Sequence, residues 1–148
     1  MVSASAPREI ALPGKGEEAG ARSLTVWERK AEMAEVNDRK VAIIGCGFVG
    51  SSSAFALMQS GLFSEIVLID ADQDRAEGEA LDISHGLPFA KPMKIYAGSY
   101  NDIVDAAIIV ITAGAGQKPG ETRLDLVKKN VGIFKSIIPE IKKRDCSG

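Results

Sequence analysis

A glycine-spaced segment, residues 41–50 with the sequence VAIIGCGFVG, constrains the fold more than any other feature of this chain. An apolar run comes before the glycines and a helical pattern follows them, which predicts a strand, a tight turn and a helix start. Gly45 would permit the sharp turn, Gly47 would let backbone approach phosphate oxygens, and Gly50 would let the helix pack on the strand. Because the first N–H groups of a helix lack intrahelical partners, the segment predicts a phosphate site.

An acidic residue, Asp70, lies twenty positions beyond Gly50 and ends a second apolar run, residues 65–70. A carboxylate here can accept a hydrogen bond from the 2′-hydroxyl of an adenosine ribose and would repel a 2′-phosphate. The two features together predict a dinucleotide site that favours NAD over NADP. A glycine-rich turn in another α/β protein, for example a methyltransferase that uses S-adenosylmethionine, is the alternative from the glycines alone.

Composition narrows the classes of protein to which the chain can belong. Its 148 residues, 45% of them hydrophobic, suffice for one domain with a core. A net charge of −2 argues against nucleic acid or an anionic membrane as partner. No apolar run reaches the ~18 residues that span a bilayer, the N-terminus lacks the apolar core of a secretory signal, and two cysteines are too few for a disulfide scaffold. We therefore expect a cytoplasmic protein, and the pattern predicts no metal site.

Two regions differ in composition. Residues 1–36 hold few large apolar side chains, so we expect a disordered N-terminal extension, with Met33 as a natural start of translation. Residues 37–148 alternate strand and helix patterns and form the expected dinucleotide-binding domain. The expected strands are residues 41–45, 65–70, 94–98 and 107–112, and the expected helices are 48–60, 74–84 (stopped by Gly86) and 121–143, with a helical turn at 101–105.

These elements predict an α/β fold, a Rossmann-type doubly wound parallel sheet truncated after about four strands in the order 3-2-1-4. The fourth strand would then be an apolar edge. In the last helix, Pro139 should cause a kink, and apolar residues recur at helical spacing. We expect them to form one buried stripe: Leu124, Val127, Val131, Phe134, Ile138 and Ile141.

The segment after the fourth strand, residues 112–124, has the composition of an active-site lid. It holds three glycines together with an amide and a guanidinium that can reach a small anionic substrate. It follows the carboxyl end of a strand, where ligands bind in such sheets. From the residues alone, the alternative is an ordinary polar connection between a strand and a helix.

Four stretches carry a resemblance to a known family: residues 45–52 (GCGFVGSS), 82–86 (DISHG), 112–115 (TAGA) and 117–123 (QKPGETR). With these, residues 38–148 resemble the N-terminal, NAD-binding half of bacterial L-lactate dehydrogenases, in the lactate/malate dehydrogenase family. The resemblance implies NAD as cofactor, a small-molecule substrate (pyruvate or lactate), and hydride transfer between the nicotinamide ring and carbon 2 of that substrate.

The resemblance also implies roles for single residues. Arg123 would polarise the substrate carbonyl as a catalytic and substrate-binding group. Gln117 would select a methyl-bearing substrate, because related malate dehydrogenases place an arginine there to pair with a second carboxylate. The implied cofactor-binding residues are Gly45, Gly47, Val49, Gly50, Asp70, Arg75, Tyr100, Gly114, Ala115 and Ser136.

The family's reaction also needs a histidine as general acid, an aspartate that holds it and an arginine that clamps the substrate carboxylate. The single histidine, His85, belongs to the DISHG stretch, which is not the family's catalytic motif. We therefore expect this chain to be the cofactor-binding half of a longer enzyme and to be inactive alone. For the full-length enzyme, the resemblance implies a homotetramer. The alternatives are a malate dehydrogenase-type 2-hydroxy acid oxidoreductase and a non-catalytic NAD-binding module.

Overall fold

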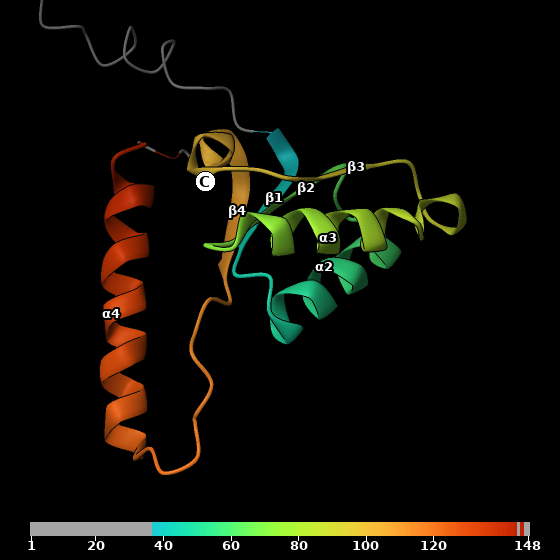
Figure 1. Cartoon of the computed structure of the whole chain (residues 1–148). Helices are drawn as coiled ribbons and strands as arrows, with labels where there is room; N and C mark the ends of the chain where they lie inside the picture. Colours follow the sequence, from blue (N-terminus) through green and yellow to red (C-terminus); the bar gives the residue numbers. More distant parts are fainter. Residues whose placement is uncertain (1–36, 145, 147–148) are drawn as a thin grey trace, which may run out of the picture.

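The computed structural model describes residues 37–144 and 146, which form a four-stranded sheet with helices on both faces (Figure 1). The strands are β1 (Asn37–Ile44), β2 (Glu65–Ile69), β3 (Lys94–Ala97) and β4 (Ala106–Ile111). They lie in the order β3-β2-β1-β4, and every neighbouring pair is parallel. The predicted fold and strand order are confirmed, with β4 as an edge strand. The expected extension, residues 1–36, lies outside the described residues.

Alternation along the strands sends side chains to two different cores. Val41 and Ile43 of β1 face α2 (Phe48–Ser60) and α3 (Gln73–Ser84), which lie side by side over one face (Figure 1). The small residues of these helices permit close packing on the strands. The buried residues that α2 and α3 add to this core are Ala54, Met58, Ala76, Ala80 and Ile83.

The other face of the sheet is covered by α4 (Arg123–Lys142), which buries Ile137 and partly buries Ile133 and Ile141, and by the turn that holds the buried Ile103. The predicted buried stripe is wrong for all but Ile141, because α4 contacts the sheet through an adjacent face. The exposed fractions of the other five residues are 64% for Leu124, 56% for Val127, 46% for Val131, 42% for Phe134 and 50% for Ile138.

The ends of the elements follow local hydrogen bonds. β1 begins four residues earlier than predicted, because Asn37 N donates to Asp105 O at 2.8 Å and pairs the chain with β4. α4 begins at Arg123, since Thr122 and Asp125 form a capping box there. Gly86 does not stop α3 in a left-handed conformation, because α3 ends at Ser84 and Gly86 has φ −80°.

The connections between these elements include two short turns, and α4 continues through its proline. Two 3₁₀ turns, η1 (Leu87–Phe89) and η2 (Tyr100–Ile103), connect α3, β3 and β4. Pro139 lies inside α4, yet Figure 1 shows α4 without the sharp bend predicted for it. Among residues 37–144 and 146, no helix has the length and apolar character needed to cross a bilayer.

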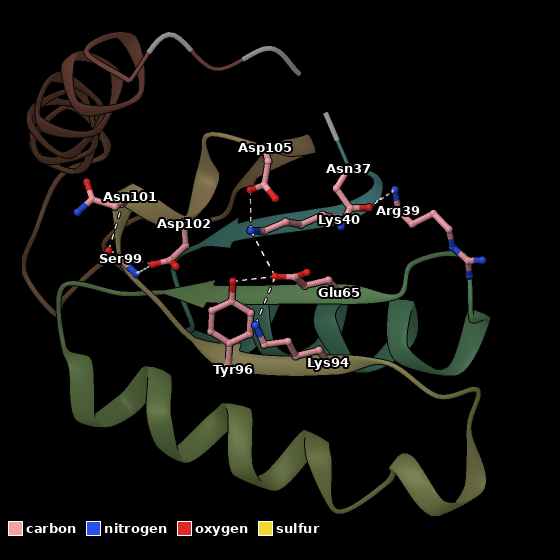
Figure 2. A network of polar contacts seen from close by, with 10 residues as sticks. All are labelled: Asn37, Arg39, Lys40, Glu65, Lys94, Tyr96, Ser99, Asn101, Asp102 and Asp105. Carbon is pink, nitrogen blue, oxygen red and sulfur yellow. Dashed lines mark hydrogen bonds and ion pairs between the residues drawn. The ribbon is translucent and has the colours of Figure 1, made fainter. Parts of the chain in front are cut away.

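A network of charges around the buried Lys40 joins the strands at the amino end of the sheet (Figure 2). Lys40 on β1 is 5% exposed, and its Nζ lies 2.7 Å from Asp105 Oδ1 and 3.3 Å from Glu65 Oε1. Tyr96 on β3 donates its hydroxyl to the same Glu65 oxygen at 2.8 Å, and Lys94 Nζ lies 4.2 Å from the centre of the Tyr96 ring. The network therefore connects β1, β2, β3 and the turn before β4.

These contacts change the protonation of the groups they join. Burial disfavours the charged lysine, but the hydrogen bond to Asp105 and the nearby Glu65 together raise the pKa of Lys40 above its ordinary value. Burial and the hydrogen bond to Glu65 raise the pKa of Tyr96 to about 12. At neutral pH the ammonium is charged and the phenol is neutral, as the geometry requires.

Candidate functional site

A hollow of about 380 Å³ lies at the opposite end of the sheet, where β1, β2 and β4 end. This is the carboxyl end, and β1 lies between strands whose connections leave in opposite directions, the place where ligands bind in open α/β sheets. The residues that line it include Gly45, Gly47, Asp70, Arg75, Tyr100, Thr112, Ala113, Gly114, Ile133, Ser136 and Ile137.

The glycine turn fits closely around the end of β1. Gly45 has φ +104°, and a Cβ there would lie 2.4 Å from Ala113 N. A Cβ on Gly50 would lie 1.9 Å from Gly45 O, so the helix touches the turn directly. At Gly47, by contrast, a Cβ would meet nothing within 4 Å. The turn is therefore closed toward the protein at Gly45 and Gly50 and open beside Gly47.

The start of α2 is suited to an anion. Gly47 is the N-cap residue, no side chain caps the helix, and its first turn holds no acidic residue. The first N–H groups of the helix therefore keep their capacity to donate to a phosphate, and the helix dipole favours negative charge there. Together with the open side of Gly47, these features fit the pyrophosphate of a dinucleotide.

Asp70 has a structural role in addition to the ribose-binding role predicted from the sequence. Its Oδ2 accepts from Cys46 N at 2.5 Å and its Oδ1 accepts from Asp72 N at 3.0 Å, so the carboxylate holds the glycine turn to the end of β2. A carboxylate has about four acceptor positions, so both oxygens can still accept from a ribose hydroxyl in the hollow. The predicted ribose partner is thus also a structural anchor.

Separate elements bring three further predicted residues to the hollow. Arg75 lies on α3, Tyr100 begins η2 and Ser136 lies on α4. Burial raises the pKa of the Tyr100 hydroxyl, and Glu140 adds to the shift, so the hydroxyl remains a hydrogen-bond donor at neutral pH. The structure thus brings these three predicted residues together, and their roles in cofactor binding stay predictions.

Other predicted cofactor residues lie next to the hollow without lining it. Val49 is exposed on the first turn of α2, and Gly50 is buried against Gly45. Ala115 is held by its backbone, because its N–H donates to Asn130 Oδ1 of α4 at 2.8 Å.

The two predicted substrate residues lie farther along, outside the lining of the hollow. Gln117 is exposed on the loop between β4 and α4, and its Nε2 donates to Glu121 O at 2.8 Å. Arg123 is exposed as the first residue of α4. Figure 1 shows this loop extending away from the sheet. The structure does not bring these side chains to the hollow, so their roles in substrate binding stay predictions.

Sequence reasoning missed two residues that support the site. Thr112 Oγ1 donates to Gly45 O at 2.7 Å and so fixes the glycine turn against the end of β4. Asn130 holds Ala115, as described above. Thr112 belongs to the recognised TAGA stretch, which was a signal for it, whereas nothing in the sequence marks Asn130 as a partner of a residue fifteen positions away.

Two groups with reactive side chains have no place in the site chemistry. Cys46 is buried beneath the turn, and burial together with the charge of Asp70 raises the pKa of its thiol to about 11, so it stays protonated. His85 is exposed where α3 ends and does not line the hollow. Among the described residues there is no group of three or more His, Cys, Asp or Glu able to hold a metal ion.

Comparisons with known proteins agree with this geometry. Residues 39–147 match the family model for the lactate/malate dehydrogenase NAD-binding domain. The chain is 64% identical to an L-lactate dehydrogenase of Thermoanaerobacterium saccharolyticum over 104 residues, 70% of this chain and 33% of the relative. It is 60% identical to the L-lactate dehydrogenase of Priestia megaterium over 110 residues, 74% and 35% of the two chains.

Solved structures give the same result. A lactate dehydrogenase from a Medee basin deep-sea metagenome has a TM-score of 0.70 at 47% identity and covers 74% of this chain and 35% of its own. The malate dehydrogenase of Archaeoglobus fulgidus, solved in complex with NADH, has a TM-score of 0.66 at 42% identity and covers 71% and 36%. The chain thus spans about a third of the length of the relatives it matches.

Proposed function

This chain belongs to the lactate/malate dehydrogenase family, whose NAD-binding domain it carries, and we propose that it is the cofactor-binding part of an NAD-dependent L-lactate dehydrogenase. When bound, NADH would supply the hydride that reduces carbon 2 of pyruvate to lactate. The observation that carries the proposal is the hollow at the carboxyl end of the sheet, with Gly47 open to it and Asp70 on its wall.

The cofactor-binding roles follow from the geometry of the hollow. The uncapped N-terminus of α2 beside Gly47 would bind the pyrophosphate through backbone N–H groups. The Asp70 carboxylate would accept from the adenosine ribose and repel a 2′-phosphate. Arg75, Tyr100 and Ser136 would complete the wall of the site. NAD rather than NADP is therefore the proposed cofactor.

The substrate roles rest on the loop between β4 and α4. Gln117 is neutral, so it cannot form the ion pair that a second substrate carboxylate would need, and this favours pyruvate over oxaloacetate. Arg123 would stabilise the charge that grows on the carbonyl oxygen during reduction. Both residues would have to reach the hollow by movement of the loop, since they lie outside its lining in the structure.

We further propose that the 148-residue chain does not complete this reaction by itself. The exposed His85 at the end of α3 does not line the hollow, and it is the only imidazole in the sequence. The assembled enzyme would be a cytoplasmic homotetramer. The exposed apolar residues of α4 support association, and light scattering coupled to gel filtration measures it.

Titration of the purified chain with NADH and with NADPH, followed by nucleotide fluorescence, tests the proposal. We expect NADH to bind about tenfold more tightly than NADPH, because only NADPH carries a phosphate to be repelled by Asp70. Equal affinity for the two nucleotides, or no binding of either, would contradict it. Pyruvate-dependent oxidation of NADH by the chain alone would contradict only the proposed inactivity.

A further inference from the structure

The segment between Gln117 and Arg123 is a closed turn rather than a loose loop. Glu121 N donates to Lys118 O at 3.1 Å, which closes a four-residue turn. Pro119 occupies its second position and Gly120, with φ +80°, its third, the residues and conformation of a type II turn. The chain then enters α4 directly, because Thr122 caps that helix.

The Glu121 carboxylate closes this turn a second time. Its Oε2 accepts from Lys118 N at 3.0 Å, so residues 118 and 121 exchange hydrogen bonds in both directions. Its Oε1 forms an ion pair with Lys129 on α4. The Glu121 side chain is only 13% exposed although its neighbours on the loop are exposed. The hydrogen bond from Lys129 lowers the pKa of Glu121, so the carboxylate is charged at neutral pH.

The turn that this carboxylate closes also holds the side-chain amide of Gln117, the predicted substrate residue. The turn places Glu121 O within 2.8 Å of Gln117 Nε2, and the ion pair with Lys129 fixes the turn to α4. We propose that Glu121 is a positioning residue, which pre-organises the segment between Gln117 and Arg123 before substrate arrives. The substrate role of this segment rests on the proposed function.

Pre-organisation has a physical consequence for substrate selection. An exposed glutamine on a free loop samples many rotamers, and ordering it during binding opposes affinity. If Glu121 already holds the turn, Gln117 and Arg123 keep a fixed spacing, and the segment moves as one unit together with the start of α4. The glycines at 114 and 116, on the strand side of the turn, are the places where such a unit can hinge.

Amide exchange and the side-chain amide signals of Gln117, measured by NMR on the 148-residue chain, test this inference. In Glu121→Ala we expect the Lys118 amide to exchange about tenfold faster and the Gln117 side-chain signals to shift toward those of a free glutamine. Glu121→Gln keeps an oxygen acceptor and should restore most of the protection. The amides of β1 should exchange at the wild-type rate in both variants, which excludes a general loss of stability.

A matched pair of lysines provides the control. Lys129→Met should reproduce part of the Glu121→Ala effect, whereas Lys128→Met should not, because Lys128 forms no ion pair with the described residues. Unchanged Lys118 exchange and unchanged Gln117 signals in Glu121→Ala would overturn the inference. Titration of the same samples with NADH reports on the proposed cofactor site separately, so failure there leaves the result on Glu121 interpretable.

Discussion

The two ends of the sheet use the same strands in opposite ways. At the carboxyl end, glycines and backbone groups surround a hollow, and Asp70 is the acidic side chain on its wall. At the amino end, Lys40, Glu65 and Tyr96 fill the space between the strands with paired polar groups (Figure 2). Side chains that satisfy one another leave no capacity for a ligand, whereas backbone N–H groups without partners at a helix start retain it. Some substitutions should therefore change the affinity for the nucleotide and leave stability unchanged, and others should do the reverse.

The largest effect is expected at the contact between α2 and the glycine turn. Gly50→Val would place a Cβ 1.9 Å from Gly45 O, where backbone cannot move aside, and should lower the free energy of unfolding by about 3 kcal/mol or more. Urea denaturation followed by circular dichroism measures this. Gly47→Ala is the matched control, because a Cβ there meets nothing within 4 Å. Gly47→Ala should stay folded and lose affinity for NADH, whereas an unchanged urea midpoint in Gly50→Val would be evidence against the tight fit.

A smaller loss of stability is expected at the amino end. Lys40→Met would leave Glu65 and Asp105 without their shared cation and should lower the free energy of unfolding by about 2 kcal/mol. The affinity of the folded protein for NADH should not change, because the network lies at the other end of the strands. Parallel urea and NADH titrations of the variant check both statements. A Lys40→Met protein with wild-type stability and weaker NADH binding would contradict the proposed difference between the two ends of the sheet.

Asp70 is the residue whose substitution should change nucleotide preference and the free energy of unfolding together. Asp70→Asn removes the charge that repels a 2′-phosphate, so the preference for NADH over NADPH should fall about tenfold. The same change weakens the charge-assisted hydrogen bond from Cys46 N and should lower the free energy of unfolding by about 1 kcal/mol. Nucleotide titration and urea denaturation are the measurements. An unchanged NADH preference would remove Asp70 from the ribose site.

The smallest effect concerns alkaline pH. The pKa of Tyr96 is raised from 10.0 to about 12, so the folded protein keeps a proton that the unfolded chain loses. The associated stability is complete below pH 10 and is lost as pH rises from about 10 to about 12. Lys40 contributes in the same direction. Tyr96→Phe should therefore make the decline above pH 10 shallower without abolishing it, as urea midpoints at pH 9 to 11 would show; an identical decline would contradict the assignment.

Local patterns were sufficient to predict the fold. The apolar runs and the glycine turn gave the four strands, their order and the bounds of α2, because each is a property of adjacent residues. The buried face of α4 was mispredicted, since periodicity marks two neighbouring apolar faces and only packing decides between them. Ile133, Ile137 and Ile141 contact the sheet, while Val127, Val131, Phe134 and Ile138 do not.

The site was predictable where it depends on backbone. Gly45, Gly47 and Asp70 meet in the hollow as expected, because the ends of parallel strands are adjacent. The contact of Lys40 with Glu65 and Asp105 depends on strand register. The anchoring of Ala115 by Asn130 depends on how α4 packs against the loop. Neither contact can be recognised from residues that are adjacent in the sequence. The substrate roles of Gln117 and Arg123 come from family resemblance and stay predictions.

The most direct test of the division between the two ends is an NADH titration of the 148-residue chain followed by backbone amide shifts in NMR. We predict shifts at the glycine turn, at Asp70 and Asp72, and at Gly114, with Lys40, Glu65 and Tyr96 unaffected. Shifts confined to the amino end of the sheet, or no shifts at nucleotide concentrations well above the millimolar range, would contradict a cofactor site at the carboxyl end.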